Sequence, residues 1–393
     1  MFIVRISALS QGCLPEGIFF TNQVDIDNFQ SNYPDCAEIL GIVNIEGPDI
    51  TKLEGLNSIT AFHNKLIIKN TSLTNFSGLE KTIAIDVGCE IIDNDDLTSF
   101  FGLDNLLSIN GYLTIGFNDN LVSLNGLGSL NQIQGSLWIA VNDNLANLSG
   151  LNNLAYTGGG ISIVNNPIVN LAGFNKIGFI GGNLHLHGNN NLTSLTGLEN
   201  ISTVVGNLEI TGNDSLTNIM SLNMLTSVGQ YIKIRNNNLL TSLSGLDNIN
   251  MEALGILRIY NNSNLSVCHI ESVCNYLTNE NGFVEIYGNN NGCNSSDEIE
   301  SACLTGVDGN PIDPAFSIYP NPATKKISIK VKDGMEIKEV NIYNQLGHIK
   351  FHSTVRKSTF DISGLGQGVY ILKVDYRNGN GSLLHFREKL MVQ

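Results

Sequence analysis

Hydrophobic residues recur along the first two thirds of the chain in a unit of 23 or 24 residues. The unit reads L-x-I-x-x-N-x-x-L-x-x-L-x-G-L-x-x-L-x-x-I-x-G, and Asn and Gly, which favour turns, separate its apolar stretches. The residue after the glycine position in successive units is Leu56, Leu79, Leu103, Leu127, Leu151, Phe174, Leu198, Leu222 and Leu246. Self-similarity at such a period is the signature of a solenoid, whose coils bury their hydrophobic sides against one another.

Each unit contains one short segment in which apolar and other residues alternate, as at 113–115, 137–139 and 208–210. Alternation with period two predicts one parallel strand per coil, with its apolar residues facing the core. An asparagine follows this strand in most coils, at Asn94, Asn118, Asn142, Asn189, Asn213 and Asn237. We expect these amides to form a ladder of hydrogen bonds to the backbone of neighbouring coils; the alternative is a turn residue selected for left-handed backbone angles.

The L-x-I-x-x-N-x-x-L core resembles a leucine-rich repeat, and the 24-residue coil with L-x-G-L-x-x-L-x-x-I is similar to the receptor L-domain version. The resemblance covers about residues 37–290. It implies a mainly β protein built on a right-handed parallel β-solenoid of about nine coils, which we place at residues 37–265. Three departures stand out. Met220-Ser221 replaces the usual small-Gly pair, Phe174 replaces a leucine, and the last coil is stretched near Met251.

The cysteines lie mainly at the two ends of the repeats. Cys13 and Cys36 flank the segment before the first coil, and Cys268, Cys274, Cys293 and Cys303 follow the last coil. A solenoid must cover the open ends of its core, so we predict disulfide-stabilised caps at 13–36 and 266–303 and an oxidising compartment. A zinc site is the weaker alternative because the cap spacings include no C-x-x-C, and three disulfide connectivities stay open for the last four cysteines. Cys89 falls at an inward strand position and is expected to be a buried small hydrophobe.

Three further segments follow from composition and pattern. Residues 1–12 form a short apolar run interrupted by Arg5, and we interpret them as the remnant of a truncated signal peptide. Residues 304–315 contain Gly, Asp and two Pro and predict a linker. Beyond the linker, alternating segments predict the strands of a small β-sandwich, at 316–319, 326–331, 337–343, 347–353, 358–362, 368–375 and 383–391.

Residues 316–393 closely resemble the type A C-terminal sorting domain of the type IX secretion system of Bacteroidetes. The matching residues are Tyr319, Pro320, Asn321, Pro322, Asn344, Gly347, Asp361, Gly368, Tyr370 and Lys389. The resemblance implies that the type IX secretion machinery carries the passenger from the periplasm to the cell surface. Such domains are commonly cleaved afterwards, and the passenger is attached to lipopolysaccharide or released. The alternative is an accessory immunoglobulin-like domain that stays in place.

Charge is distributed unevenly between these modules. Residues 316–393 contain 12 basic and 6 acidic residues, a net charge of +6, whereas the rest of the chain contains 9 and 30, a net charge of −21. This asymmetry favours two units with separate roles. The overall charge of −15 argues against a nucleic-acid partner, because binding to a duplex requires clustered Lys and Arg. No apolar run reaches the about 18 residues of a membrane helix.

The sequence contains no G-x-S-x-G, H-E-x-x-H or Walker motif, so we predict neither enzymatic activity nor a cofactor. His185 and His187 occupy outward positions of one strand, but the spacing fixes no third ligand, so solvated histidines are favoured over a metal site. The acidic segments 93–96 and 118–120 suit turns better than they suit calcium.

The outward strand positions form the candidate functional site, because successive coils place them about 4.8 Å apart. One column contains Thr114, Trp138, Ser162, His185, Glu209, Lys233 and Arg258, and a second contains Gly116, Ala140, Val164, His187, Thr211, Arg235 and Tyr260. Lys233, Arg235, Arg258 and Tyr260 predict a cationic and aromatic patch for an anionic glycan or a protein. Trp138, the single tryptophan, is a candidate contact for a sugar ring. The alternative is a strand face of mixed polar residues without a ligand.

We therefore expect a secreted, cell-surface binding or adhesion protein. A rigid solenoid face would contact a protein or glycan ligand, and the C-terminal module would direct export. The alternative is a structural component of the cell envelope that associates with itself.

Overall fold

The computed structural model describes residues 12–252, 254–278, 282–305, 316–331, 335–344, 348–354, 357–377 and 383–393. The chain divides into two compact units, residues 1–296 and 297–393. Residues 1–11 of the predicted signal-peptide remnant and residues 306–315 of the predicted linker lie outside the described residues.

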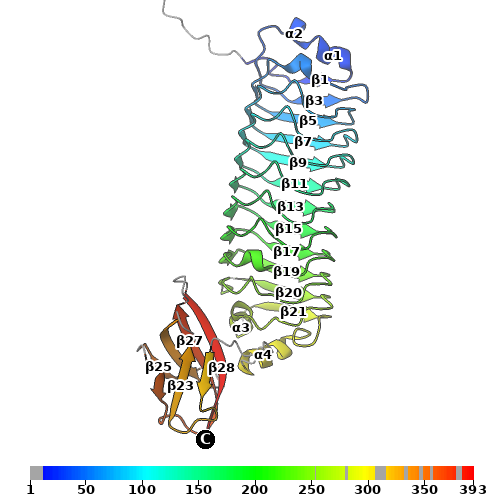
Figure 1. Ribbon diagram of the computed structural model, residues 1–393. Helices are drawn as coiled ribbons and strands as arrows, with labels where there is room; N and C mark the ends of the chain where they lie inside the picture. Colours follow the sequence, from blue (N-terminus) through cyan, green and yellow to red (C-terminus); the bar gives the residue numbers. More distant parts are fainter. Residues whose placement is uncertain are drawn as a thin grey trace, which may run out of the picture. The chain divides into compact units, whose positions relative to one another are not determined.

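The first unit is a parallel β-solenoid, which confirms the predicted fold (Figure 1). Its main sheet, which we call the long sheet, has twelve strands in parallel register. In order they are β1 (Ile18–Phe20), β3 (Val43–Glu46), β5 (Lys65–Lys69), β7 (Gly88–Ile92), β9 (Tyr112–Gly116), β11 (Leu137–Ala140), β13 (Ile161–Val164), β15 (Leu184–His187), β17 (Leu208–Thr211), β19 (Tyr231–Arg235), β20 (Ile256–Tyr260) and β21 (Phe283–Tyr287).

A second parallel sheet contains nine strands of two residues each, contributed by another side of the coils. In chain order these strands are β2 (Glu38–Ile39), β4 (Ala61–Phe62), β6 (Ala84–Ile85), β8 (Ser108–Ile109), β10 (Gln132–Ile133), β12 (Tyr156–Thr157), β14 (Phe179–Ile180), β16 (Thr203–Val204) and β18 (Ser227–Val228). The core lies between the sheets and consists of buried Leu, Ile and Phe residues such as Leu113, Ile115 and Phe100.

The solenoid has about 11 turns, which corrects the prediction of about nine. The Gly-Leu pair undercounts the coils because the terminal ones lack it. Strand β1 precedes the coil that contains the first pair, and β20 and β21 follow the last pair. The long sheet therefore continues through β21 into the segment 266–303 that we assigned to the C-terminal cap.

The glycine of the repeat occupies a crowded turn with a left-handed backbone. Gly126 has a φ of +111°, and a Cβ atom there would lie 1.9 Å from the carbonyl oxygen of Phe100 in the preceding coil. Only glycine fits such a position without strain. The departure at Met220-Ser221 has a local explanation, because this coil replaces the glycine turn with the 3₁₀ helix η2 (Met220–Leu222).

The asparagine ladder is confirmed. Asn142 Oδ1 accepts hydrogen bonds from the backbone N–H and from Nδ2 of Asn118 in the preceding coil, at 3.3 and 3.1 Å. Its Nδ2 donates to the carbonyl oxygens of Ile115 and Ala140. Three asparagines that we had not assigned to the ladder, Asn166, Asn262 and Asn289, extend it. The residue with left-handed backbone angles is not the ladder asparagine but the residue before it, as at Val141 with a φ of 54°.

The N-terminal end of the core is covered by α1 (Gln23–Asp27), α2 (Phe29–Asn32) and the 3₁₀ helix η1 (Glu54–Leu56). Ile26 and Phe29 from these helices are fully buried. A disulfide joins Cys13 to Cys36 next to this cap, as predicted.

The C-terminal end of the solenoid carries α3 (Glu271–Leu277), and α4 (Ser296–Thr305) lies at the boundary between the two units. Cys268 pairs with Cys293, and Cys274 and Cys303 are disulfide-bonded as well. Cys89 is a free, buried thiol, and burial raises its pKa to about 12. The predicted small hydrophobe at this position is therefore confirmed.

The second unit contains all seven predicted strands, in two antiparallel sheets compatible with a sandwich. One sheet has the order β22 (Phe316–Tyr319), β23 (Lys326–Val331) and β26 (Thr359–Asp361), and the other has β25 (Ile349–Ser353), β24 (Glu336–Tyr343), β27 (Gly368–Arg377) and β28 (Leu383–Val392). Both sheets contribute to one hydrophobic core, which includes Ile327, Val340 and Leu372. Within the described residues, no helix is long and apolar enough to cross a membrane.

Candidate functional site

The strand register confirms the two predicted columns of outward residues on the long sheet. Trp138 pairs with Thr114 on one side and with Ser162 on the other, and Lys233 pairs with Arg258. The residues of the first column are all partly buried. In the second column Gly116, Ala140 and Thr211 are buried and the others are partly buried, whereas the inward neighbours of both columns have no exposed surface or almost none. We call this exposed surface of the long sheet the outward face.

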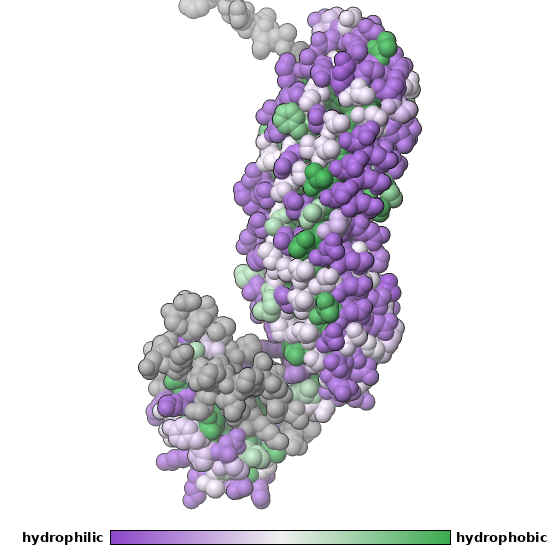
Figure 2. Space-filling view, turned by 45° about the vertical axis from the view of Figure 1, so that its right-hand side comes forward, coloured by the Kyte–Doolittle hydropathy of each residue, from purple (hydrophilic) through white to green (hydrophobic). Residues whose placement is uncertain are grey.

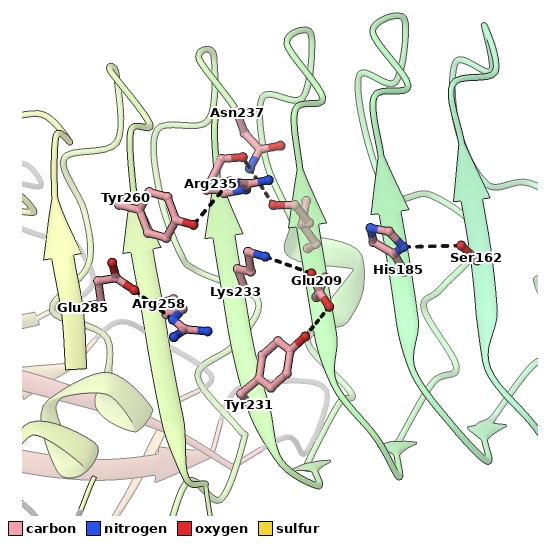
Figure 3. Close-up of polar contacts among 11 residues, drawn as sticks. Ser162, His185, Glu209, Tyr231, Lys233, Arg235, Asn237, Arg258, Tyr260 and Glu285 are labelled. Carbon is pink, nitrogen blue, oxygen red and sulfur yellow. Dashed lines mark hydrogen bonds and ion pairs between the residues drawn. The ribbon is translucent and has the colours of Figure 1, made fainter. Parts of the chain in front are cut away.

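Lys233 and Glu209 form an ion pair on neighbouring strands of the outward face, with Nζ and Oε2 3.3 Å apart (Figure 3). The Tyr231 hydroxyl donates a hydrogen bond to the same carboxylate. Burial opposes ionisation of Glu209, but the Tyr231 hydrogen bond and the Lys233 charge outweigh it and lower the pKa of the carboxyl. Burial and this hydrogen bond raise the pKa of Tyr231 to about 12. A second glutamate that contacts both a lysine and a tyrosine occurs in earlier coils, where Glu90 pairs with Lys65 and accepts a hydrogen bond from the Tyr112 hydroxyl.

Arg258 is also paired, because its Nε lies 2.8 Å from Glu285 Oε2 on strand β21. Arg235 differs from the other two cations. Its guanidinium carbon lies 5.9 Å from the centre of the Tyr260 ring, and Nη1 lies 3.5 Å from the Tyr260 hydroxyl. In the described part of the chain, no carboxylate pairs with Arg235 and its buried Nε has no partner. Figure 3 shows these side chains on adjacent strands.

The cationic patch is therefore weaker than its sequence indicated. Glu209 and Glu285 neutralise two of the three cations, and only Arg235 keeps a charge without a carboxylate partner among the described residues. The predicted column of outward residues includes Glu209. Glu285 is not in that column, because it lies in the segment 266–303 that is predicted to form the C-terminal cap. The coil that runs from β20 to β21 places Glu285 27 residues after Arg258, a separation that the 24-residue period does not indicate.

His185 and His187 lie side by side on β15, with ring centroids 5.7 Å apart. Ser162 Oγ lies 3.4 Å from His185 Nδ1. Burial is the main cause that lowers the pKa of His185, and the charge of Lys233 adds to it. His185 is therefore a neutral hydrogen-bonding group at neutral pH. The structure joins the two histidines to no third ligand within the described residues.

Trp138 lies over a position without a side chain. A Cβ atom on Gly116 would lie 2.6 Å from the indole ring, and the Phe117 ring is 6.2 Å away. Beside Trp138 the surface is hollowed by a groove of about 430 Å³, whose lining includes Trp138, Gly160, Ser162, Asn183 and His185. The columns predicted that Trp138 and His185 share this face, but the groove itself depends on glycines outside the strand pattern.

One charged cluster was missed by the sequence analysis. His63 lies between two carboxylates from neighbouring coils, with Nδ1 2.7 Å from Asp86 and Nε2 3.0 Å from Glu38. The hydrogen bonds to Glu38 and Asp86 raise the pKa of His63. All three residues sit at or beside the two-residue strands, and their separations of 25 and 23 residues are the signal that could have revealed them.

Several residues of the predicted sorting motif form hydrogen bonds that connect turns and strands within the second unit. Asn321 Oδ1 accepts from the backbone N–H of Met391, and Ala323 exchanges backbone hydrogen bonds with residues 391 and 393. Asp361 accepts from the Ser363 backbone, and the Tyr370 hydroxyl donates to Gly366. Three further motif residues, Tyr319, Pro320 and Pro322, belong to one segment with cis bonds before both prolines.

The remaining motif residues occupy other parts of the module. The Asn344 side chain accepts from the backbone of His348, and Gly368 begins β27. Lys389 is in β28. Gly347 lies outside the described residues.

Comparison with known proteins identifies the C-terminal module. Residues 317–389 match the family model of the secretion system C-terminal sorting domain. Among solved structures, the chain is similar to the crystal structure of InlP from Listeria monocytogenes, with 12% identity, coverage of 96% of this chain and 88% of that chain, and a TM-score of 0.23. No curated protein matches the chain.

The match confirms the predicted sorting domain. It indicates secretion through the type IX system and export to the cell surface or the extracellular space. The type IX machinery is therefore a partner of this chain. The match does not extend to the solenoid, whose outward face is the candidate functional site.

Proposed function

We propose that the protein is a cell-surface binding or adhesion protein that presents the outward face of its solenoid to a protein or glycan ligand and performs no covalent chemistry. The main support for this proposal is the contrast between the inward and outward positions of the long sheet. Inward positions repeat Leu and Ile in coil after coil, whereas outward positions change from Trp to His to charged residues. A rigid scaffold with variable exposed positions suits recognition.

Export supports this proposal, because a secreted solenoid meets ligands outside the cell.

We also propose that the sorting domain is removed after export and that the passenger is attached to lipopolysaccharide. The intact mass of the mature surface protein tests this step. A mass that retains residues 317–393 would contradict it.

The binding proposal is tested with the purified protein on an array of glycans and immobilised proteins. Arg235→Ala and Tyr260→Ala should each weaken the strongest interaction, because Arg235 is the cation whose charge is not neutralised by a described carboxylate. Lys176→Ala is a matched control that removes an exposed cation away from the long sheet. Circular dichroism should show that all three variants keep the wild-type fold.

Two outcomes would contradict the proposal. Binding that is equal in the wild type and in all outward-face variants would show that this face makes no contact. Concentration-dependent self-association in analytical ultracentrifugation, with no array ligand, would instead favour the structural envelope component that associates with itself.

A further inference from the structure

We propose that the groove beside Trp138 is a binding site for a neutral pyranose ring of a glycan, with the indole as its stacking surface. The groove lies along β11, β13 and β15 on the outward face and includes the residues just before β13 and β15. This inference rests on the proposed function, because it assigns a ligand class to part of the same surface.

The first argument is the way in which Trp138 is held. The absence of a side chain at Gly116 leaves room for the indole, which would clash with any Cβ atom there. Phe117 supports the ring from the side at 6.2 Å between centroids, and the indole is only half-buried. A fixed and partly exposed aromatic ring offers a large apolar contact at a small cost in conformational entropy.

The second argument is the shape of the surface next to the ring. Gly159, Gly160 and Gly182 line the groove and contribute no side chains, so the backbone forms its floor. These glycines are required by close packing between coils, because a Cβ atom on Gly159 would lie 2.4 Å from Ser136 Oγ. The resulting volume of about 430 Å³ falls within the range of small-molecule sites.

The third argument is the chemistry of the lining. Ser162 and His185 offer a hydroxyl and an imidazole 3.4 Å apart, and Asn183 contributes an exposed amide. Such groups pair with the hydroxyl groups of a sugar. No Lys, Arg, Asp or Glu lines the groove, and burial keeps the His185 imidazole neutral. An uncharged site on a module with a net charge of −21 favours an uncharged ligand.

A glycan fits these observations better than a protein does. A protein interface needs about 800 Å² on each partner and a desolvated apolar core. The neighbours of Trp138 on adjacent strands are Thr114, Ser162 and the small residue Gly116, and the small residue Ala140 follows on its own strand. Figure 2 shows hydrophobic residues scattered among hydrophilic ones on the face of the solenoid that it displays.

Trp138 is the single tryptophan of the chain, so its fluorescence reports on this groove alone. The experiment titrates the full chain with short neutral oligosaccharides of glucose, mannose and N-acetylglucosamine, and with uronic-acid oligosaccharides as anionic probes. We expect a saturable change in emission with at least one neutral series. Isothermal titration calorimetry then compares the variants. Trp138→Ala should weaken binding by about tenfold or more, and Ser162→Ala and His185→Ala by smaller factors.

Phe179→Ala is the matched control, because it removes an exposed aromatic ring from the second sheet and should not change binding. Gly116→Ala provides an independent test, since it displaces the indole without removing it and should also weaken binding. A response restricted to anionic probes, or to protein ligands, would refute the inference. No response to the neutral series, with Arg235→Ala still impairing array binding, would refute it while the proposed function stands.

Discussion

At the scale of single residues, the turn after each strand of the long sheet shows how closely the repeat constrains the backbone. The residue before each ladder asparagine is left-handed, and Asn, Asp or Gly occupies it in most coils. Val141 is an exception, with a φ of 54°. A β-branched residue in this region is strained, because its side chain approaches the following carbonyl oxygen.

Replacement of Val141 by Asn should therefore stabilise the protein by about 1 kcal/mol, since Asn tolerates left-handed angles. Urea unfolding followed by circular dichroism measures the effect. Asn165→Val, at the same position of the next coil, is the reciprocal change and should destabilise by a similar amount. Equal stabilities of the two variants would contradict this explanation.

His63 predicts a dependence of stability on pH. Hydrogen bonds to Glu38 and Asp86 raise its folded pKa above the usual value of 6.5. The folded state then binds the proton more tightly than the unfolded state. The stabilisation is fully present below the unfolded pKa of 6.5 and is lost as pH rises through the higher folded pKa.

The free energy of unfolding, measured on both sides of pH 6.5, should therefore fall more steeply with rising pH in the wild type than in His63→Gln. The effect is modest because the cluster is partly exposed to solvent. Parallel pH profiles for the two proteins would show that the pair of carboxylates does not hold the proton.

At the scale of one coil, the asparagine ladder connects each turn to the turns on either side. Asn142 accepts from the preceding coil through Oδ1 and donates to two backbone carbonyls through Nδ2, all in a fully buried position. Buried polar groups that lose their partner cost about 1–3 kcal/mol each.

Asn142→Ala removes partners from several buried groups at once, so it should destabilise the protein by more than about 2 kcal/mol. Asn144→Ala is the matched control, because Asn144 is exposed and its Nδ2 donates to the carbonyl oxygen of Asp119. Chemical denaturation should show a change near zero for the control. A similar small loss for both variants would mean that water replaces the ladder.

At the scale of the whole molecule, the chain combines a sorting module with a solenoid. The second unit has its own hydrophobic core and its own sheets. The match to the sorting-domain family covers residues 317–389 and therefore falls within this unit alone.

Deletion of residues 317–393 should leave the solenoid in the periplasm and abolish its appearance at the surface of the native cell. Fractionation and surface labelling of cells that produce the wild-type or the truncated chain test this expectation. Asn344→Ala is a milder variant, which removes the side chain that accepts from the His348 backbone. Unchanged surface labelling of the truncated chain would contradict a sorting role for this unit.

Most of the fold was predictable because it is encoded locally and repeatedly. Leu113 and Ile115 face the core through alternation within one strand, and the same pattern returns in every coil. The seven strands of the second unit followed from the same rule. Asn166 was missed as a ladder residue, although it stands at the same position of its coil.

The sequence by itself therefore determined the solenoid, its inward and outward positions and the sorting module, because these depend on periodicity and on short motifs. The tertiary structure decided the pairing of Arg258 with Glu285, the pairing of Cys268 with Cys293, and the groove beside Trp138. These features depend on the length of particular coils and on the exact stacking of turns. A contact between side chains in different coils is fixed only when the register of those coils is fixed.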